Sequence, residues 1–473
     1  MTLRGRRPGD RRVRVERVKA HDFAVAPPHR VRRPPAPALV LVAGFAALVT
    51  IGTVLLLLPI STEPGAATDI VTALFTATSA VCVTGLVVVD TATHWSPFGE
   101  VVILLLIQVG GFGFMTGSTL LLFLLIGRRT GLRDRILVQA STGGIELGSV
   151  VALIRRVAAF TVLAEALGTV VLTAAFLGDG RAVPEALWWG TFHSISAFNN
   201  AGFDLTGGFR SLADFATNPV VLATIGTLIV LGGLGFAILG DAIGKRSWAR
   251  LALETKVVLL GSVVLIAGGS LAIGLLEWSN PDTLGSIPEA HRPLNAVFEA
   301  VTLRTAGYAV LDHGALGEAT LFVAMALMFI GGASGSTAGG IKLNTFGVLL
   351  IAIASTVRGR PSAEAFGRRV SHEVIYRALS VALLAIAFVF VVGFGVVVIA
   401  GTPFVDTTFE AISAFATVGL TTGITPDLPD PARLIVAFAM FAGRLGPLTL
   451  VLALAARQRP VSYRPAIESM RIG

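Results

Sequence analysis

The sequence predicts an all-α polytopic membrane protein: four span–pore-helix–span repeats in a pseudo-fourfold arrangement around one pore, with eight full transmembrane spans. Three observations carry this prediction. Hydrophobic residues make up 54% of the 473 residues, charged residues only 14%, and the mean hydropathy is +0.79. Basic and acidic loops alternate along the chain. A loop that ends in glycine recurs four times, each time between two apolar segments.

The composition excludes a water-soluble globular protein. Such proteins carry about 25% charged residues, so this chain needs a lipid bilayer to cover its apolar surface. Many windows exceed the roughly 18 apolar residues that mark a transmembrane helix. The expected full spans are 37–60, 97–126, 150–178, 218–241, 255–277, 319–351 (interrupted), 374–400 and 432–456.

The charge distribution predicts the orientation. The net charge of +8 could suggest a nucleic-acid partner, but eleven Arg or Lys lie between Arg4 and Arg33 and the other basic clusters fall in every second loop. By the positive-inside rule this pattern places both termini in the cytoplasm, with no nucleic-acid partner. The tail 1–35 is interpreted as a disordered cytoplasmic extension, or as a contact site for anionic lipid or a partner protein. One cysteine, Cys82, excludes an internal disulfide framework.

Four apolar segments of about 12 residues separate the paired spans, and they are too short to cross a membrane. They lie at 68–80, 184–197, 292–302 and 404–414, and we expect them to be re-entrant pore helices. Irregular backbone at membrane depth is tolerated only inside protein or along a water-filled cavity. The repeats are expected at 36–130, 131–250, 251–360 and 361–460, between the tails 1–35 and 461–473.

The loop after each pore helix is the expected ion-binding segment. The four loops are Val81, Cys82, Val83, Thr84 and Gly85; Asn199, Asn200, Ala201 and Gly202; Arg304, Thr305, Ala306 and Gly307; and Ala416, Thr417, Val418 and Gly419. Their glycines fall 117, 105 and 112 residues apart. A second glycine-containing segment, called the glycine landmark below, follows in the next span of each repeat. The four landmarks start at Gly110, Gly232, Gly331 and Gly443.

Backbone carbonyls are the expected ligands, because rings of carbonyls replace the water shell of potassium in its channels. Each loop has one glycine, whereas tetrameric potassium channels carry Thr-Val-Gly-Tyr-Gly, so a less strict filter is expected. The side chain of Arg304 is expected to point back into the protein. Asn199 and Asn200 are interpreted as scaffold hydrogen-bonders, and Cys82 as a contributor of its carbonyl.

The third repeat is interrupted by ten consecutive small residues at 331–340. We expect the backbone to leave the helix there as a flexible plug below the filter; close helix packing through small residues is the alternative. The candidate gate residues are Gly331, Gly332, Gly335, Ser336, Thr337, Gly339, Gly340, Lys342 and Arg444. Arg444 is an ionisable residue at membrane depth, and such residues usually have a functional role. It is predicted to face the pore and to hold the plug by hydrogen bonds to the backbone carbonyls of 331–340. Glu165 is expected to hydrogen-bond at a helix interface, with ion carriage as the alternative.

Together these motifs resemble the superfamily of potassium transporters that includes the Trk, Ktr and fungal Trk-type proteins, over roughly residues 37–460. The resemblance rests on the four glycine loops, on 331–340 with Ile341 and Lys342, and on the segment from Gly443 to Thr449. With eight spans and no additional pair before the first repeat, the chain is more similar to the Ktr membrane (KtrB-type) subunit than to the longer Trk subunit.

The resemblance implies potassium selectivity, with the filter glycines matching Gly85, Gly202, Gly307 and Gly419, and a gate in which Arg444 contacts the glycine-rich loop. It also implies a homodimer with one pore per protomer. A cytoplasmic KtrA/TrkA-like ring of nucleotide-binding domains would regulate it, and members of this type are often stimulated by sodium. This chain has no Gly-x-Gly-x-x-Gly unit, so no organic cofactor is expected in it and any nucleotide control requires a separate protein.

The function expected from these residues is gated potassium uptake across the cytoplasmic membrane, driven by the membrane potential. The alternatives are a less selective monovalent cation channel and a Na+- or H+-coupled potassium symporter. An intramembrane enzyme is disfavoured, because His372-Glu373 lacks the second His of a His-Glu-x-x-His motif. A membrane scaffold without transport would leave the four matched loops unexplained.

Overall fold

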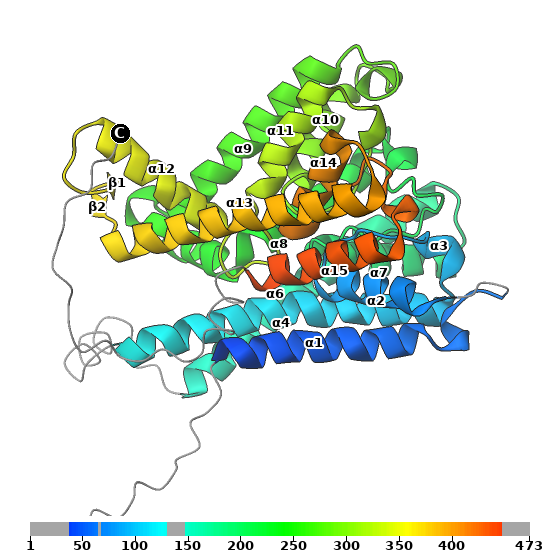
Figure 1. Cartoon of the computed structure of the whole chain (residues 1–473), viewed down its shortest axis with the longest axis horizontal. Coiled ribbons are helices and arrows are strands. Elements are labelled where there is room, and N and C mark those ends of the chain that lie inside the picture. Colours follow the sequence, from blue (N-terminus) through cyan, green and yellow to red (C-terminus); the bar gives the residue numbers. More distant parts are fainter. Residues whose placement is uncertain (1–36, 65–67, 130–146, 447–473) are drawn as a thin grey trace, which may run out of the picture. The chain divides into compact units, whose positions relative to one another are not determined.

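The computed structural model describes residues 37–64, 68–129 and 147–446. The described chain is helical, and each repeat contains a long helix, a short helix and a second long or broken helix (Figure 1). The predicted tails 1–35 and 461–473 and the last part of the span 432–456 lie outside the described residues.

The main helices agree with the predicted segments to within a few residues, apart from the last one, which is described only as far as Leu445. They are α1 (Pro37–Leu56), α2 (Ile70–Val81) and α4 (Pro97–Arg129); α6 (Leu147–Gly178), α7 (Val183–Phe198) and α8 (Pro219–Lys245); α9 (Leu253–Glu277), α10 (Arg292–Thr302), α11 (Glu318–Phe329) and α12 (Leu343–Val357); and α13 (His372–Ala400), α14 (Phe404–Ala416) and α15 (Asp430–Leu445).

Within the described residues, the connections contain one further α-helix, several 3-10 turns and one hairpin. These are α3 (Thr91–His94), η1 (Pro59–Ser61), η2 (Ala213–Phe215), η3 (Trp248–Arg250), η4 (Leu284–Ser286), η5 (His313–Ala315) and η6 (Thr425–Asp427), with β1 (Glu364–Ala365) paired antiparallel to β2 (Arg368–Arg369). The predicted all-α architecture holds, and within it the short turn at Phe366-Gly367 lets two residues on each side pair.

Five helices of the described chain, α1, α6, α8, α9 and α13, are long and apolar enough to cross a membrane. On α13, Phe390, Phe394 and Val398 recur every four residues and are 73%, 65% and 67% exposed, which is the pattern of a helix face that meets lipid. The protein is therefore a multi-pass membrane protein.

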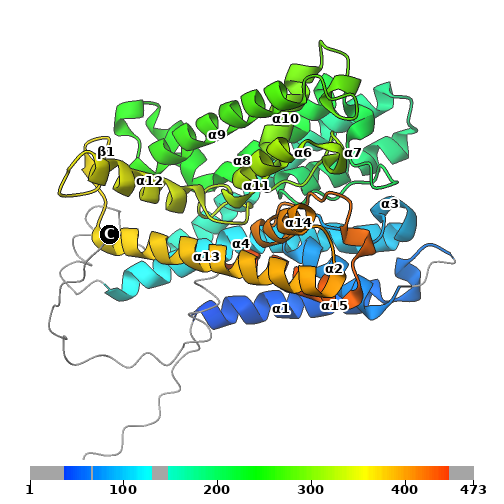
Figure 2. The same cartoon turned by 45° about the horizontal axis from the view of Figure 1, so that its top comes forward.

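The short helices form the interior. In α2, nine of the twelve residues are buried, and Figures 1 and 2 show α14 beside α13. The second long helix of each repeat packs against the short helix of the next repeat. These pairs are α4 with α7, α8 with α10, α11 with α14, and α15 with α2. The last pair returns to the first repeat, so the order of contacts closes on itself.

The interrupted span of the third repeat was predicted correctly. α11 ends at Phe329 and α12 begins at Leu343, and the backbone between them forms a loop. The loop is closed at its base, where Gly331 N donates to Ile341 O at 2.9 Å and Leu343 N donates to Gly332 O at 2.9 Å. In the second repeat α8 continues through its landmark with a kink at Gly235, whose φ is 74°.

Candidate ion-conducting site

The four loops share one backbone conformation. Gly85, Gly202, Gly307 and Gly419 have φ of 93°, 69°, 79° and 96°. The residue two positions before each glycine is also left-handed: Val83, Asn200, Thr305 and Thr417 have φ between 49° and 71°. Such backbone costs about 1–3 kcal/mol at a non-glycine residue and persists only where the surroundings impose it. Its recurrence in all four loops shows that they are built as equivalent units.

The four glycines pack around a closed ring of carbonyls. A β-carbon on Gly85 would come closer than 3.0 Å to Ala201 O, and one on Gly202 would do the same to Ala306 O. A β-carbon on Gly307 would come closer than 3.0 Å to Val418 O, and one on Gly419 would do the same to Thr84 O. Each glycine thus contacts the carbonyl that precedes the next glycine. Real β-carbons essentially never approach an atom so closely, so only glycine fits at these positions.

Pore-helix serines that the sequence analysis missed support three of the loops. The amide of Gly85 donates to Ser79 Oγ at 3.0 Å, and the amide of Gly419 donates to Ser413 Oγ at 3.2 Å. Ser196 Oγ donates to Phe203 O at 2.8 Å. Each serine stands six positions before its filter glycine, a spacing that could have revealed them; the third repeat has Val301 there.

Buried polar side chains of the short helices hold the chain where it leaves the candidate filter. Glu299 Oε1 accepts from the amides of Val310 and Leu311 at 2.9 and 3.0 Å. In the second repeat His193 Nε2 lies 3.4 Å from Leu205 N, and in the fourth Thr425 Oγ1 donates to Glu410.

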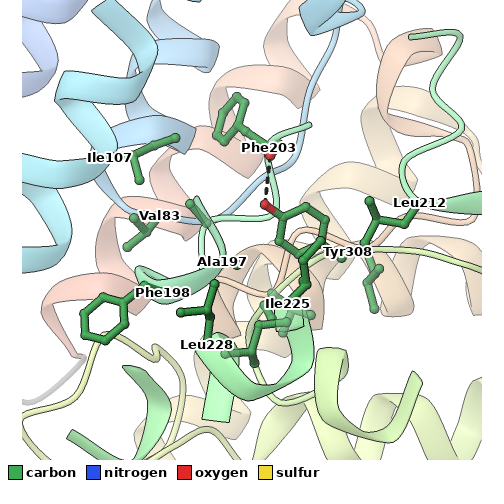
Figure 3. Close-up of a cluster of buried hydrophobic side chains, with 14 of the residues drawn as sticks. Val83, Ile107, Ala197, Phe198, Phe203, Leu212, Ile225, Leu228 and Tyr308 are labelled. Atoms are coloured by element: carbon green, nitrogen blue, oxygen red, sulfur yellow. Dashed lines mark hydrogen bonds between the residues drawn. The ribbon is translucent and has the colours of Figure 1, made fainter. Parts of the chain in front are cut away.

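The second and third loops are also joined to each other beyond their glycines. Tyr308 Oη donates to Phe203 O at 3.1 Å, and Figure 3 shows this bond within the cluster that contains Phe198 and Leu212. The bond connects the residues that directly follow Gly307 and Gly202.

The polar side chains of the loops turn into the protein scaffold. Arg304 is 8% exposed and its Nη2 donates to Ser262 Oγ on α9 at 3.1 Å. Asn199 Nδ2 donates to Gln108 Oε1 at 2.8 Å and to Glu165 Oε1 at 3.1 Å. Glu165 therefore hydrogen-bonds at the interface of α4, α6 and α7, as its placement in the sequence suggested.

The loop 331–340 lies against the other repeats. Ala333 N donates to Gly233 O at 2.9 Å and Thr337 N donates to Gly232 O at 3.2 Å, both on α8. A β-carbon on Gly339 would overlap Thr417 Oγ1 of the fourth filter loop, and one on Gly331 would lie 3.3 Å from Thr305 Cγ2. The loop is thus packed directly against residues of the filter loops.

Arg444 makes the contact predicted for it. Its side chain is 1% exposed; Nη1 donates to Thr337 O in the glycine-rich loop, and Nη2 lies 3.5 Å from Gly110 O on α4. Lys342 Nζ donates to Ala338 O within the same loop. A guanidinium offers five donors in a fixed fork, which lets one residue contact two repeats at once.

Comparison with known proteins agrees with this geometry. The TrkH family profile, described as a cation transport protein, matches residues 27–461. The chain belongs to the TrkH family. It is therefore a transport protein and not an enzyme, as the sequence predicted.

Two relatives of this TrkH-family chain cover almost its whole length. It is 41% identical to the Ktr system potassium uptake protein B of Bacillus subtilis, over 89% of this chain and 93% of the relative. It is 37% identical to the potassium/sodium uptake protein NtpJ of Enterococcus hirae, over 94% and 99%. The crystal structure of the potassium transporter TrkH from Vibrio parahaemolyticus shares the fold, with a TM-score of 0.69 over 90% of this chain and 86% of that one, at 18% identity.

Two carboxylates lie on the loops that leave the first two filter segments of this TrkH-family protein. Asp90 Oδ2 accepts from the amide of Phe209 at 2.9 Å, which ties the first repeat to the second. Burial raises the pKa of Asp204 to about 6, and repulsion from Asp90 adds to this, while a hydrogen bond from Thr206 opposes it.

Proposed function

We propose that this chain takes up potassium across the cytoplasmic membrane through a gated, carbonyl-lined selectivity filter, driven by the membrane potential. The observation that carries the proposal is the closed ring in which each filter glycine packs against the carbonyl before the next one. A ring of four carbonyls, from Thr84, Ala201, Ala306 and Val418, can replace the hydration shell of a monovalent cation.

The membrane potential alone can drive the uptake, so this protein does not need to hydrolyse ATP. One cation that enters a cell at 100 mV, inside negative, gains about 2.3 kcal/mol. Potassium is the cation we propose because the Bacillus relative is a potassium uptake protein by name. Sodium is a proposed stimulating ion.

The complete architecture proposed is four repeats in pseudo-fourfold arrangement around one pore, with eight full spans and both termini in the cytoplasm. The closed order of contacts from α4 and α7 round to α15 and α2 supports the single pore. The alternation of basic and acidic loops supports the orientation.

The loop 331–340 is the proposed gate. It belongs to the third repeat, yet it reaches Asn200 in the second and Thr417 in the fourth. In the ring of contacts these two filter loops lie opposite each other, so the loop spans the path below the filter. Arg444 holds it there through Thr337 O.

The proposed assembly is a homodimer with one pore per protomer, bound to a cytoplasmic KtrA/TrkA-like ring of nucleotide-binding domains. The Bacillus relative is named as protein B of a Ktr system, which supports a system of more than one component. Control by nucleotide would then act on the gate from a separate protein.

A second candidate is a less selective monovalent cation channel, or a potassium symporter coupled to Na+ or H+. Two observations favour it. The four loops differ in sequence, and the Enterococcus relative is named as a potassium/sodium uptake protein. The dependence of uptake on sodium and on pH, and the reversal potential of the current, separate these candidates.

The test is uptake of labelled rubidium into proteoliposomes that contain this chain alone, with an imposed inside-negative potential, with and without sodium. Uptake driven by the potential and competed by potassium is expected. If the wild type is silent, the variant lacking residues 333–338 distinguishes a closed gate from a wrong function. A variant that is folded and still silent would contradict the proposal.

A further inference from the structure

Thr337 of the glycine-rich loop contacts both the second and the fourth repeat. It is 1% exposed, and every polar atom that it has is engaged. Its amide donates to Gly232 O at 3.2 Å, and its carbonyl accepts from Arg444. Its hydroxyl lies 3.0 Å from Asn200 Oδ1 and 3.3 Å from Phe198 O.

The hydroxyl therefore touches the filter itself. Phe198 is the last residue of α7, and Asn200 is the left-handed residue two positions before Gly202. Between them they fix the short segment that presents Ala201 O to the carbonyl ring. One hydroxyl hydrogen shared between the two acceptors holds both ends of this segment.

Gly232 on α8 leaves room for the contact between Thr337 and the second filter loop. A β-carbon on Gly232 would lie within 3.0 Å of Phe198 O, Thr337 Oγ1 and Asn200 Oδ1 together. Any side chain at Gly232 would push the three groups apart. The first and fourth repeats share the approach of a glycine to a carbonyl at the end of the short helix, at Gly110 and Gly443, whereas the contact with Thr337 Oγ1 belongs to Gly232.

The neighbouring hydroxyl provides a contrast. Ser336 is also fully buried, but its Oγ donates to Ala333 O at 2.7 Å within the glycine-rich loop. The two adjacent side chains therefore separate two roles: Ser336 stabilises the loop internally, whereas Thr337 connects the loop to the second filter segment.

From this geometry we infer that Thr337 is a positioning residue for the second filter loop, so that ion selectivity depends on the state of the gate. The inference rests on the proposed function. With the glycine-rich loop in place, the hydroxyl fixes Phe198 O and Asn200, and Ala201 O completes the ring. When the loop moves, this support is lost and the filter discriminates less well between rubidium and sodium.

The experiment compares Thr337→Val, which keeps the shape and removes the hydroxyl, with Thr337→Ser, which keeps the hydroxyl, and with Ser336→Ala as the matched control. Each purified variant is reconstituted, and rubidium uptake is measured against increasing sodium to give a rubidium-to-sodium preference. Monodispersity in size-exclusion chromatography shows that a variant is folded. If Thr337→Val does not fold, Thr337→Ala takes its place.

Thr337→Val is expected to lower the preference about fivefold, the factor that corresponds to one ordinary hydrogen bond. Thr337→Ser is expected to restore it, and Ser336→Ala to keep it whatever its effect on the rate. The variant lacking 333–338 should conduct with the same lowered preference.

A wild-type preference in Thr337→Val, or an equal loss in Ser336→Ala, would overturn the inference and leave potassium uptake intact. Wild-type protein and deletion variant that both lack potassium-competed uptake would instead overturn the proposed function.

Discussion

Replacing Gly85 by alanine adds one methyl group at the ring of carbonyls. The φ of 93° at this position disfavours any residue with a β-carbon, at a cost of about 1–2 kcal/mol. The new β-carbon would also lie closer than 3.0 Å to Ala201 O, and overpacking of this kind costs about 1–3 kcal/mol. The two terms together amount to about 2–5 kcal/mol.

This cost falls on the ring of carbonyls, because relief requires Thr84 O or Ala201 O to move. Since each 1.4 kcal/mol is a factor of ten in an equilibrium constant, the lower figure corresponds to about a thirtyfold loss in the preference for rubidium over sodium. The assay is competition of labelled rubidium uptake by sodium in proteoliposomes.

Gly423→Ala is the matched control. Gly423 has a φ of 100°, but no atom lies within 4 Å of where its β-carbon would be. This variant shares the backbone strain of Gly85→Ala without the contact to the neighbouring loop, so it should keep the wild-type preference. A wild-type preference in folded Gly85→Ala, or an equal loss in Gly423→Ala, would refute the reasoning.

Three further predictions concern the proposed gate and the loops that follow the filter segments. Arg444→Gln should raise rubidium uptake by the chain alone about tenfold or more, because hydrogen bonds from a charged group contribute about 1.5–3 kcal/mol. Arg433→Gln, whose guanidinium donates to the carbonyl of Pro426, is the control, and equal rates in both would contradict the role of Arg444. Removing 333–338 should also raise uptake, and no rise would favour simple helix packing by this segment. For Asp204, whose pKa is raised to about 6 from 3.8, the folded state binds more protons than the unfolded state between those values, so its contribution to stability falls as pH rises through that window. Thermal unfolding of Asp204→Asn should lack this fall, and parallel curves for the two proteins would show the reasoning to be wrong.

The sequence predicted the helices well because apolar length and glycine position are local signals. The short helix 292–302 was placed at its observed bounds, and the break at 331–340 was expected from ten consecutive small residues. The contact of Arg444 with the glycine-rich loop was also predicted, because a buried guanidinium needs acceptors and a non-helical loop provides free carbonyls.

Other features of the candidate site could not be read from the sequence, because they depend on contacts between distant segments. The close approach of Gly85 to Ala201 O joins two different repeats, and no local pattern indicates it. Thr337 lies 137 residues from Asn200, and no local pattern marks it among the small residues around it. The hairpin at Glu364–Arg369 was missed because two-residue strands carry no periodicity.

We propose that the carbonyls of Thr84, Ala201, Ala306 and Val418 surround a binding site for potassium. The most direct measurement is a crystal structure of the protein in rubidium, with anomalous scattering recorded at the rubidium edge. An anomalous peak is expected on the axis between these four oxygens, and it should be lost in Gly85→Ala. A peak elsewhere in the molecule, with none between the four carbonyls, would contradict it.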